Sequence, residues 1–275
     1  YGWRFLKLAW KLRDTYDSVF VHMNEEYLLI SGWLWRVLGK RVYLWRNHYA
    51  GSFRTDIAVF FCNTVFCTST HSYTARFKKT KLMPVGVDVE RFTKSTSPKK
   101  HSILFFSRIS PSKRPEMLIE ALGLLKEKGV TFTASIVGSP LPEYEPYHRM
   151  LQAKVGTLGL SSNVTFSPGV SHDRAGEIFR AHEVFVNASP SGMFDKVVFE
   201  ASASGCFVLT SSEDFKEMAG EAYWFSDTQS LANRLQEVLT QNERGASNEI
   251  LQRVAKENSF ENLMEKLKSV ILQTK

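Results

Sequence analysis

Cysteine is scarce in this 275-residue sequence, which contains only Cys62, Cys67 and Cys206. Three cysteines so scattered exclude a disulfide framework and a zinc ribbon. Each of them lies in an apolar run typical of a strand. We therefore expect buried, reduced thiols in a cytoplasmic protein.

Long apolar stretches are also missing, since no run reaches the roughly 18 apolar residues that a membrane-spanning helix needs. This excludes a transmembrane helix.

The sequence shows no helix-turn-helix, zinc or aromatic RNA-binding signature. Positive charge is in excess, because the net charge is +7 and the pI is about 9.2. Such a balance indicates anionic partners, which could be phosphates, nucleic acid or an acidic lipid surface.

The first segment, Tyr1–Arg13, combines aromatic and leucine side chains with four basic residues. A basic, aromatic-rich helix of this kind could lie on a membrane surface. It could equally be a helix that faces the core and keeps its basic side in water. We favour the core-facing helix.

The order of apolar runs predicts parallel sheets, because short β-branched or aromatic runs alternate with helical stretches. In the first part of the chain we expect strands at 18–21, 41–45 and 64–68, with helices at 25–38, 53–61 and 71–77. The second part predicts six strands, at 102–106, 132–137, 164–166, 184–187, 207–210 and 223–225. A doubly wound domain usually has about six strands, so the first series is half of what is expected.

A turn-rich segment separates the two series. Pro84–Asp88 leads into a polar run that ends at Lys100, as is typical of a linker. We therefore predict an α/β protein with two doubly wound, Rossmann-like domains. Residues 1–86 form a partial N-terminal domain, residues 87–101 a linker, and residues 102–275 a complete C-terminal domain.

Ligands of parallel sheets bind at the carboxyl ends of the strands, so the loops after the strands carry the candidate residues. The first loop of the second series contains Arg108 and Lys113, two cations that could neutralise a diphosphate. In the loop after the strand at 132–137, Gly138 would let a ligand approach the backbone, although a plain tight turn explains this glycine equally well. The loop 166–170, which ends at Val170, could read the edge of a base.

The strongest segment is Ser189–Gly205, where a glycine-containing loop enters a short helix. Free N–H groups at a helix start favour an anion such as a phosphate. Glu200 lies among small and apolar residues of this helix, a poor place for a carboxylate without a partner. The hydroxyl pair of a ribose would supply two hydrogen bonds to it. An exposed helix position is the alternative interpretation.

These motifs together resemble the GT-B glycosyltransferases of family 4. The resemblance rests on Pro84–Asp88 with Phe92, on Ser107-Arg108 with Lys113-Arg114-Pro115, and on the later segments around 137–138, 164–169, 189–191 and 199–201. Their order and spacing match the family over about residues 17 to 260. No single motif is decisive.

The resemblance implies roles for individual residues. Arg108 and Lys113 would hold the diphosphate of a UDP- or GDP-sugar donor, Glu200 would bind its ribose, and the loop of Met193, Phe194 and Asp195 would face the sugar. Gly138 and Val170 would border the nucleotide. The family's first glutamate, eight positions before the second, falls on Gly192. Asp195 could replace that glutamate or could simply cap the following helix.

In the first domain, His22 lies at a strand end where relatives place a histidine near the reacting sugar. There it could orient a hydroxyl or exchange protons. A structural role is the alternative, and His48 is a weaker second candidate. The family's usual glycine-rich loop near the start of its first domain has no counterpart here. We interpret the first domain as truncated.

The resemblance implies a retaining hexosyltransferase that moves a sugar to a glycan or lipid-linked hydroxyl. We expect no cofactor and no metal, because the sequence has no Asp-x-Asp motif or histidine cluster. Peripheral membrane contact is a further expectation, and nucleic acid is not an expected partner. A non-catalytic nucleotide-sugar-binding protein and a sugar-nucleotide epimerase or hydrolase remain as alternatives.

Overall fold

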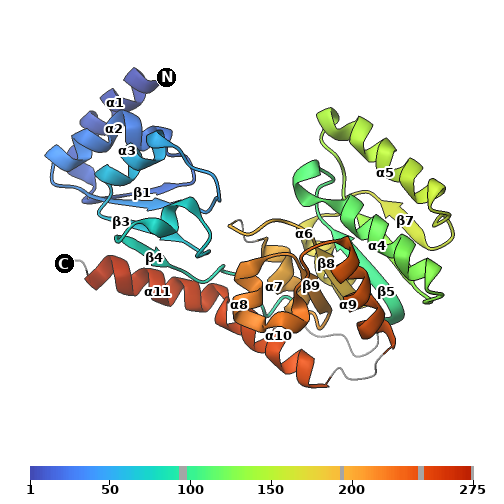
Figure 1. The fold of residues 1–275 in the computed structure, drawn as a ribbon. Helices are drawn as coiled ribbons and strands as arrows, with labels where there is room; N and C mark the ends of the chain where they lie inside the picture. Colours follow the sequence, from blue (N-terminus) through green and yellow to red (C-terminus); the bar gives the residue numbers. More distant parts are fainter. Residues whose placement is uncertain (93–97, 193–194, 241–244, 274–275) are drawn as a thin grey trace. The chain divides into compact units, whose positions relative to one another are not determined.

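The computed structural model describes residues 1–92, 98–192, 195–240 and 245–273 of the chain (Figure 1). Contacts divide these residues into two units. The first unit consists of Tyr1–Met83 together with Ser191 and Gly192, and the second unit contains the rest. Each unit has its own parallel sheet and its own hydrophobic core.

The sheet of the first unit has four parallel strands in the order β1-β2-β3-β4. Their bounds are β1 Ser18–His22, β2 Arg41–Trp45, β3 Thr64–Cys67 and β4 Thr80–Leu82. The three predicted strands are confirmed, and β4 is an addition. Sequence patterns miss β4 because it has three residues, none of which is buried. It gives no apolar run to detect.

Helices α1 (Gly2–Lys11), α2 (Glu26–Val37) and α3 (Phe53–Phe61) belong to the first unit, and α2 and α3 lie on the same side of its sheet (Figure 1). The predicted helix at 71–77 is a single 3₁₀ turn, η2, at Tyr73–Arg76. Leu28 and Leu34 of α2 pack with Val42 and Leu44 of β2 in the core. On the opposite face of the sheet, Tyr43 and Phe66 are also buried and stack at a centroid distance of 6.0 Å, so both faces contribute to the stability of this unit.

Helix α1 has one face on this core and one in solvent. Ala9 is buried, and Phe5 and Leu6 pack against the core cluster. In contrast, Trp3 and Trp10 expose 69% and 52% of their surfaces. The core-facing prediction is thus confirmed, and the exposed face carries these tryptophans besides its basic residues. Within the described residues, no helix combines the length and apolar character that crossing a membrane requires.

The sheet of the second unit has five parallel strands in the order β7-β6-β5-β8-β9. Their bounds are β5 Lys99–Phe106, β6 Thr133–Val137, β7 Val164–Ser167, β8 His182–Asn187 and β9 Phe207–Thr210. The strand order reverses between β5 and β8, which is the topological switch point of a doubly wound sheet. Five of the six strands predicted for this part of the chain are confirmed.

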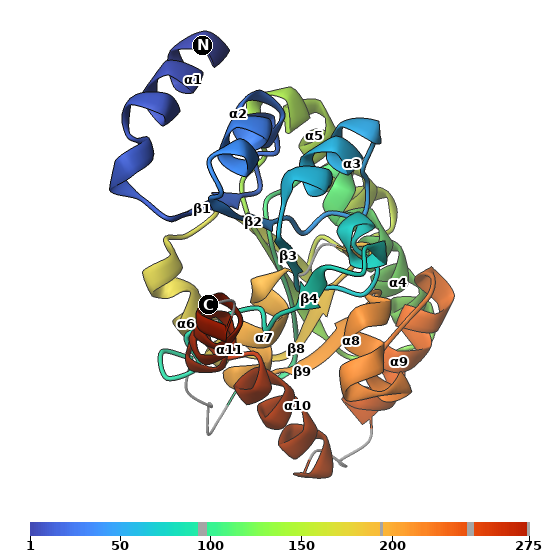
Figure 2. The ribbon, with the colours of Figure 1, turned by 90° about the vertical axis from the view of Figure 1, so that its left-hand side faces the viewer.

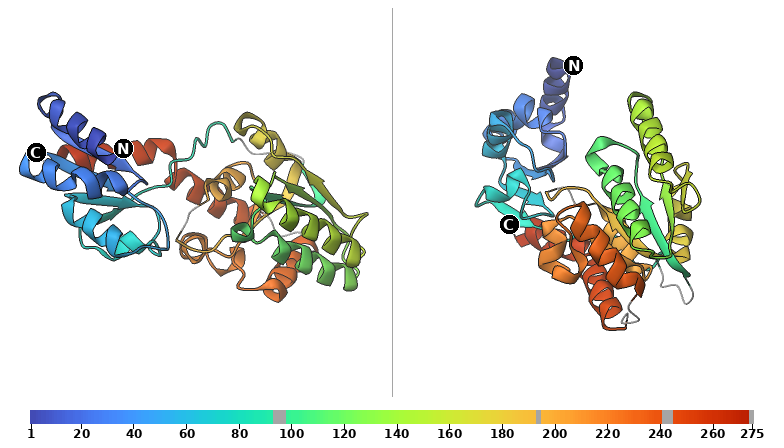
Figure 3. Two further views of the ribbon diagram at one scale, coloured as in Figure 1. Left: turned by 90° about the horizontal axis from the view of Figure 1, so that it is seen from above. Right: turned by 45° about the vertical axis from the view of Figure 1, so that its right-hand side comes forward.

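Helices cover both faces of the second sheet, as the helix colours on either side of it show in Figure 3. Leucines of α4 (Pro115–Glu127), α5 (Glu145–Thr157) and α9 (Thr228–Thr240) fill the core on one face. On the other face, Phe179 of α6 (His172–Ala181) packs on Phe106 and Phe185, at ring distances of 5.2 and 5.5 Å. The remaining helices are α7 (Lys196–Ala203), α8 (Glu213–Ala219), α10 (Gly245–Glu257) and α11 (Phe260–Gln273).

The strand predicted at 223–225 is wrong. Residues Glu221–Tyr223 form a 3₁₀ turn, η5, and Trp224 makes only an isolated bridge to Thr210. Tyr223 and Phe225 are nevertheless buried. The apolar pattern reflects this burial and not a strand.

The joint between α10 and α11 binds the segment that opens the second unit (Figure 2). The backbone oxygen of Asn258 accepts hydrogen bonds from the N–H groups of Gly86 and Val87, both at 3.0 Å. Its side-chain oxygen accepts a third from Val85, at 3.2 Å. The last two helices are thereby tied to the first residues of this unit.

All three cysteines are buried and none forms a disulfide within the described residues, which agrees with the prediction for them. Burial raises the pKa of Cys62 and of Cys206 to about 12. Both thiols are therefore neutral and unreactive at neutral pH.

Candidate functional site

A cavity of about 510 Å³ lies at the carboxyl ends of β5, β6 and β7, next to the start of α7. Five of the predicted site residues line it, namely Arg108, Lys113, Gly138, Val170 and Asp195. They come from four separate loops. The structure brings them together because parallel strands end at one edge of the sheet.

The remaining predicted residues lie elsewhere. Glu200 is on α7, whose first two residues line the cavity, but its own side chain does not. His22 is the last residue of β1 in the first unit. Met193 and Phe194 lie outside the described residues.

The cations of the cavity sit on a loop with defined geometry. Residues Pro111–Lys113 form the 3₁₀ turn η3, and Arg114 then adopts a left-handed conformation with φ of 49° just before α4 begins at Pro115. The guanidinium of Arg114 makes hydrogen bonds within the protein. It donates to Ala188 O at 2.6 Å and to Ser211 Oγ at 2.7 Å. Arg108, in contrast, is exposed.

Lys113 forms a partly buried ion pair with Asp195. Its Nζ lies 2.5 Å from Oδ1 and 2.7 Å from Oδ2 of Asp195, and the two side chains are only 13% and 17% exposed. Asn187 Nδ2 and Ser189 Oγ donate to the same carboxylate. The Lys113 cation at the cavity wall therefore already has an anionic partner.

Asp195 occupies the N-cap position of α7, but its side chain makes no capping hydrogen bond. The interpretation of Asp195 as a simple helix cap is therefore wrong in this structure. Its carboxylate turns toward Lys113 instead. A contact of Asp195 with the transferred sugar stays a prediction.

Gly138 is required by the protein backbone itself. A Cβ at this position would lie 1.8 Å from the carbonyl oxygen of Ser107, which no movement of a flexible side chain can relieve. The N–H of Gly138 also donates to Ser167 O at 2.9 Å. The glycine thus allows the loops after β5 and β6 to pack closely at the cavity.

Replacing Gly138 with alanine should destabilise the second unit by about 2–3 kcal/mol, because the added methyl group forces two backbone segments apart. Chemical denaturation of the purified protein measures this loss. Gly156→Ala on α5 is the control, since a Cβ there meets nothing within 4 Å. A helical glycine replaced by alanine should gain about 0.5–1 kcal/mol. Equal stability of the two variants would contradict the close-packing explanation.

Glu200 is buried at 4% exposure, so the alternative of an exposed helix position is wrong. Its Oε1 lies 3.2 Å from Nε2 of His172, the first residue of α6. Sequence reasoning missed His172. The available signal was its place two residues after the loop 166–170, which was already singled out.

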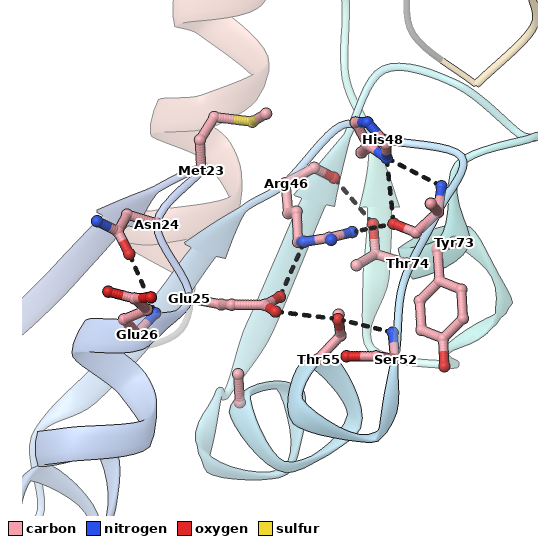
Figure 4. Close-up of polar contacts among 12 residues, drawn as sticks. Met23, Asn24, Glu25, Glu26, Arg46, His48, Ser52, Thr55, Tyr73 and Thr74 are labelled. Atoms are coloured by element: carbon pink, nitrogen blue, oxygen red, sulfur yellow. Dashed lines mark hydrogen bonds and ion pairs between the residues drawn. The ribbon is translucent and has the colours of Figure 1, made fainter.

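In the first unit, the polar network shown in Figure 4 surrounds the ends of β1 and β2. Glu25 pairs with Arg46, whose Nε lies 2.9 Å from Oε2, and Thr55 Oγ1 donates to Oε1 at 3.2 Å. Arg46 and His48 both contact Ala50: the guanidinium donates to Ala50 O at 3.0 Å, and the N–H of Ala50 donates to His48 Nδ1 at 2.9 Å. These bonds fix the loop that carries His48.

His22 lies at the edge of this network with an exposed side chain. Its ring stacks beside Trp45 at a centroid distance of 6.4 Å. The next residue, Met23, has a φ of 62°, a strained conformation for a residue with a side chain. The chain therefore turns sharply after His22 and leaves its imidazole at the strand end.

Gly192 has a φ of 84°, which favours glycine over every other residue. In the first unit its carbonyl oxygen accepts a hydrogen bond from Ser72 Oγ at 3.1 Å. A Cβ would lie 2.7 Å from Cβ of Tyr49 and 2.8 Å from the carbonyl oxygen of His71. A glutamate at position 192 therefore does not fit the backbone of this loop.

Two α/β units, each with a parallel sheet, and a cationic cavity at the carboxyl ends of the second sheet are the features of a GT-B fold. UDP-bound Anabaena HepE is similar over 98% of this chain and 82% of its own, with a TM-score of 0.84 and 18% identity. Sucrose-phosphate synthase from Thermosynechococcus elongatus is similar over 98% and 76%, with a TM-score of 0.78 and 16% identity. The predicted α/β, GT-B-like fold is confirmed.

The family model described as glycosyl transferases group 1 matches residues 87–261. The chain therefore belongs to this family. A D-inositol 3-phosphate glycosyltransferase from Rhodococcus opacus is 28% identical over 135 residues. That match covers 48% of this chain but only 30% of the relative, so the chain spans about a third of its length.

Proposed function

We propose that this protein is a family 4 glycosyltransferase that moves a hexose from a nucleoside-diphosphate sugar to a hydroxyl group with retention of configuration. The observation that carries the proposal is the cavity in which Arg108 and Lys113 meet the start of α7. Lys196 adds a third cation to its lining. Such a concentration of positive charge suits a diphosphate.

In the proposed reaction the bond between the sugar C1 and the diphosphate oxygen breaks, and the acceptor oxygen bonds to C1 on the same face. Negative charge grows on the departing diphosphate, where Arg108 and Lys113 stabilise it. The acceptor loses its proton to the leaving phosphate. His22 orients a hydroxyl near the reacting sugar, and Asp195 contacts the sugar in place of the missing glutamate.

The nature of the donor is supported by the solved structures. Anabaena HepE has been determined with UDP and with UDP-glucose. We propose a UDP- or GDP-sugar as the donor for this chain. The charge of the phosphates is neutralised by side chains in this proposal, without a bound cofactor or metal.

We further propose a glycan or lipid-linked acceptor. The exposed Trp3 and Trp10 of α1 lie on a helix that also carries Lys7 and Lys11. Amphipathic side chains of this kind suit the headgroup region of an anionic bilayer. Peripheral contact through α1 would bring a lipid-linked acceptor to the enzyme.

A second candidate is a nucleotide-sugar-binding protein without turnover. The conformation of Gly192, which excludes the family's first glutamate, favours it. The Lys113–Asp195 pair does not distinguish the two, because a bound donor has to share or displace it in both.

A thermal-shift panel of UDP-, GDP- and other nucleotide sugars tests the proposal. Saturation at about 100 times the dissociation constant should stabilise the fold by about 2.7 kcal/mol. The stabilising donor is then incubated with a mixture of glycan and lipid-linked acceptors, and NMR of the product gives its anomeric configuration. A retained glycoside supports the proposal. Binding without turnover supports the second candidate, and free sugar or an epimer as product contradicts both.

A further inference from the structure

His172 and Glu200 form a contact between two neighbouring helices of the second unit, α6 and α7. His172 opens α6, and Glu200 lies in the second turn of α7. The Nε2 and Oε1 atoms are 3.2 Å apart. The exposed fractions of the two side chains differ widely, at 59% for His172 and 5% for Glu200.

A buried carboxylate needs hydrogen-bond donors, because removing it from water is costly. Among the described residues, the imidazole of His172 is the one side chain that contacts the Glu200 carboxylate. A carboxylate offers about four acceptor positions on its two oxygens. One donor from His172 therefore leaves most of the acceptor capacity of Glu200 for a ligand.

The imidazole of His172 has a buried aromatic neighbour, Phe92. The ring of Phe92, which is 1% exposed, meets it edge to face at a centroid distance of 5.7 Å and an angle of 79°. Phe92 in turn packs on Phe179 of α6 at 6.1 Å. An ion pair between Arg91 and Asp173 ties the same two segments together. These contacts restrict the position of the His172 ring.

The pair also lies beside the cavity. Val170, two residues before His172, lines it, and so do Lys196 and Val197 of the helix that carries Glu200. The side of the cavity next to Val170 and α7 is therefore the side nearest to this pair. Arg108 and Lys113 contribute the cationic lining.

We propose that His172 is a positioning residue for nucleotide binding. Its Nε2–H donates to Glu200 Oε1 and orients the carboxylate so that the other oxygen accepts hydrogen bonds from the ribose hydroxyls of the donor. This inference rests on the proposed function, since it requires a nucleoside diphosphate in the cavity. It assigns His172 to the recognition of ribose and not to the chemistry of transfer.

Calorimetric titration with three probes tests this role. The probes are UDP or GDP, the matching 2′,3′-dideoxynucleoside diphosphate, and inorganic pyrophosphate. His172→Ala should weaken binding of the ribonucleotide about tenfold, as expected for loss of a hydrogen bond to a charged group. Affinity for the dideoxynucleotide and for pyrophosphate should stay within about twofold of the unmodified protein, a difference too small to reflect a lost hydrogen bond. The preference for ribose over dideoxyribose therefore shrinks.

Three variants separate positioning from a structural role. His172→Phe keeps an aromatic ring against Phe92 but has no donor, so the tenfold loss of ribonucleotide affinity is expected for it as well. This variant provides the test if His172→Ala fails to fold. His172→Gln places an amide donor near the position of Nε2 and should restore most of the ribose preference. Arg174→Ala, a change of an exposed residue on the same helix, is the matched control and should alter none of the three affinities.

The results of these titrations show separately whether the role of His172 or the proposed function is wrong. If the unmodified protein binds neither nucleotide nor pyrophosphate, the proposed function is wrong and the inference falls with it. If the unmodified protein prefers the ribonucleotide and His172→Phe keeps that preference in full, only the inference is wrong. Tighter binding of the ribonucleotide by His172→Phe would also overturn it, because His172 would then compete with the ribose for Glu200.

Discussion

Replacing Lys113 with alanine should weaken the binding of UDP or GDP by about 2–4 kcal/mol, or roughly 30- to 1,000-fold. Two effects add up. The variant lacks the cation that faces the diphosphate, and it leaves the carboxylate of Asp195, 17% exposed, without its Lys113 partner. An unpaired anion at the wall of the cavity repels the ligand. Calorimetric titration with the nucleotide and with inorganic pyrophosphate measures both affinities.

Asp195 variants separate these two effects. Lys113→Ala combined with Asp195→Ala should recover part of the lost affinity, because the repelling carboxylate is gone. Asp195→Asn alone frees Lys113 and should leave diphosphate binding unchanged or tighter. Lys128→Ala, next to the end of α4, is the control, since the amine of Lys128 donates to the amide oxygens of Asn233 and Gln236 and does not line the cavity. If Lys113→Ala binds both ligands as tightly as the control, the diphosphate site is misplaced.

Replacing Glu200 with alanine should weaken nucleotide binding by about 2–3 kcal/mol, the loss expected when ribose hydroxyls lose a charged acceptor. Affinity for pyrophosphate should change little, because Glu200 does not line the cavity that we propose for the phosphates. The ratio of the two affinities is therefore the informative measurement. Glu200→Gln keeps the shape of the side chain and one oxygen, so a smaller loss is expected.

The matched control for Glu200 is Glu237→Ala on α9. Glu237 is an exposed carboxylate that pairs with Arg234 on the same helix, and its removal should cost little. If Glu200→Ala weakens neither UDP nor GDP binding, the ribose role is wrong. A parallel loss of pyrophosphate affinity would show that the variant disturbs the fold of α7 and not a single contact.

Much of the second unit could be predicted because its strands are short apolar runs with helices between them. The positions of the loops followed from the same alternation of strands and helices. Arg108 and Asp195 are far apart in the sequence but line one cavity, as the rule for parallel strand ends predicts. Local sequence thus sufficed to find which loops meet.

Pairings between side chains could not be predicted in the same way. The Lys113–Asp195 ion pair and the His172–Glu200 contact depend on the angles at which separate loops and helices meet. No periodicity encodes those angles. Gly138 shows the same limit, because its sequence context cannot reveal a carbonyl oxygen 1.8 Å from the missing Cβ.

The hydrogen bonds from Val85, Gly86 and Val87 to Asn258 have a consequence for folding during synthesis. Three backbone donors near the start of the second unit find their acceptors 171 to 173 residues later. Contacts of such long sequence separation close late, since the loop between them must be ordered first. The ribosome must therefore release Asn258, which follows α10, before this unit can reach its native state, and a shortened chain that stops ahead of Asn258 leaves the N–H groups of Val85, Gly86 and Val87 without these acceptors.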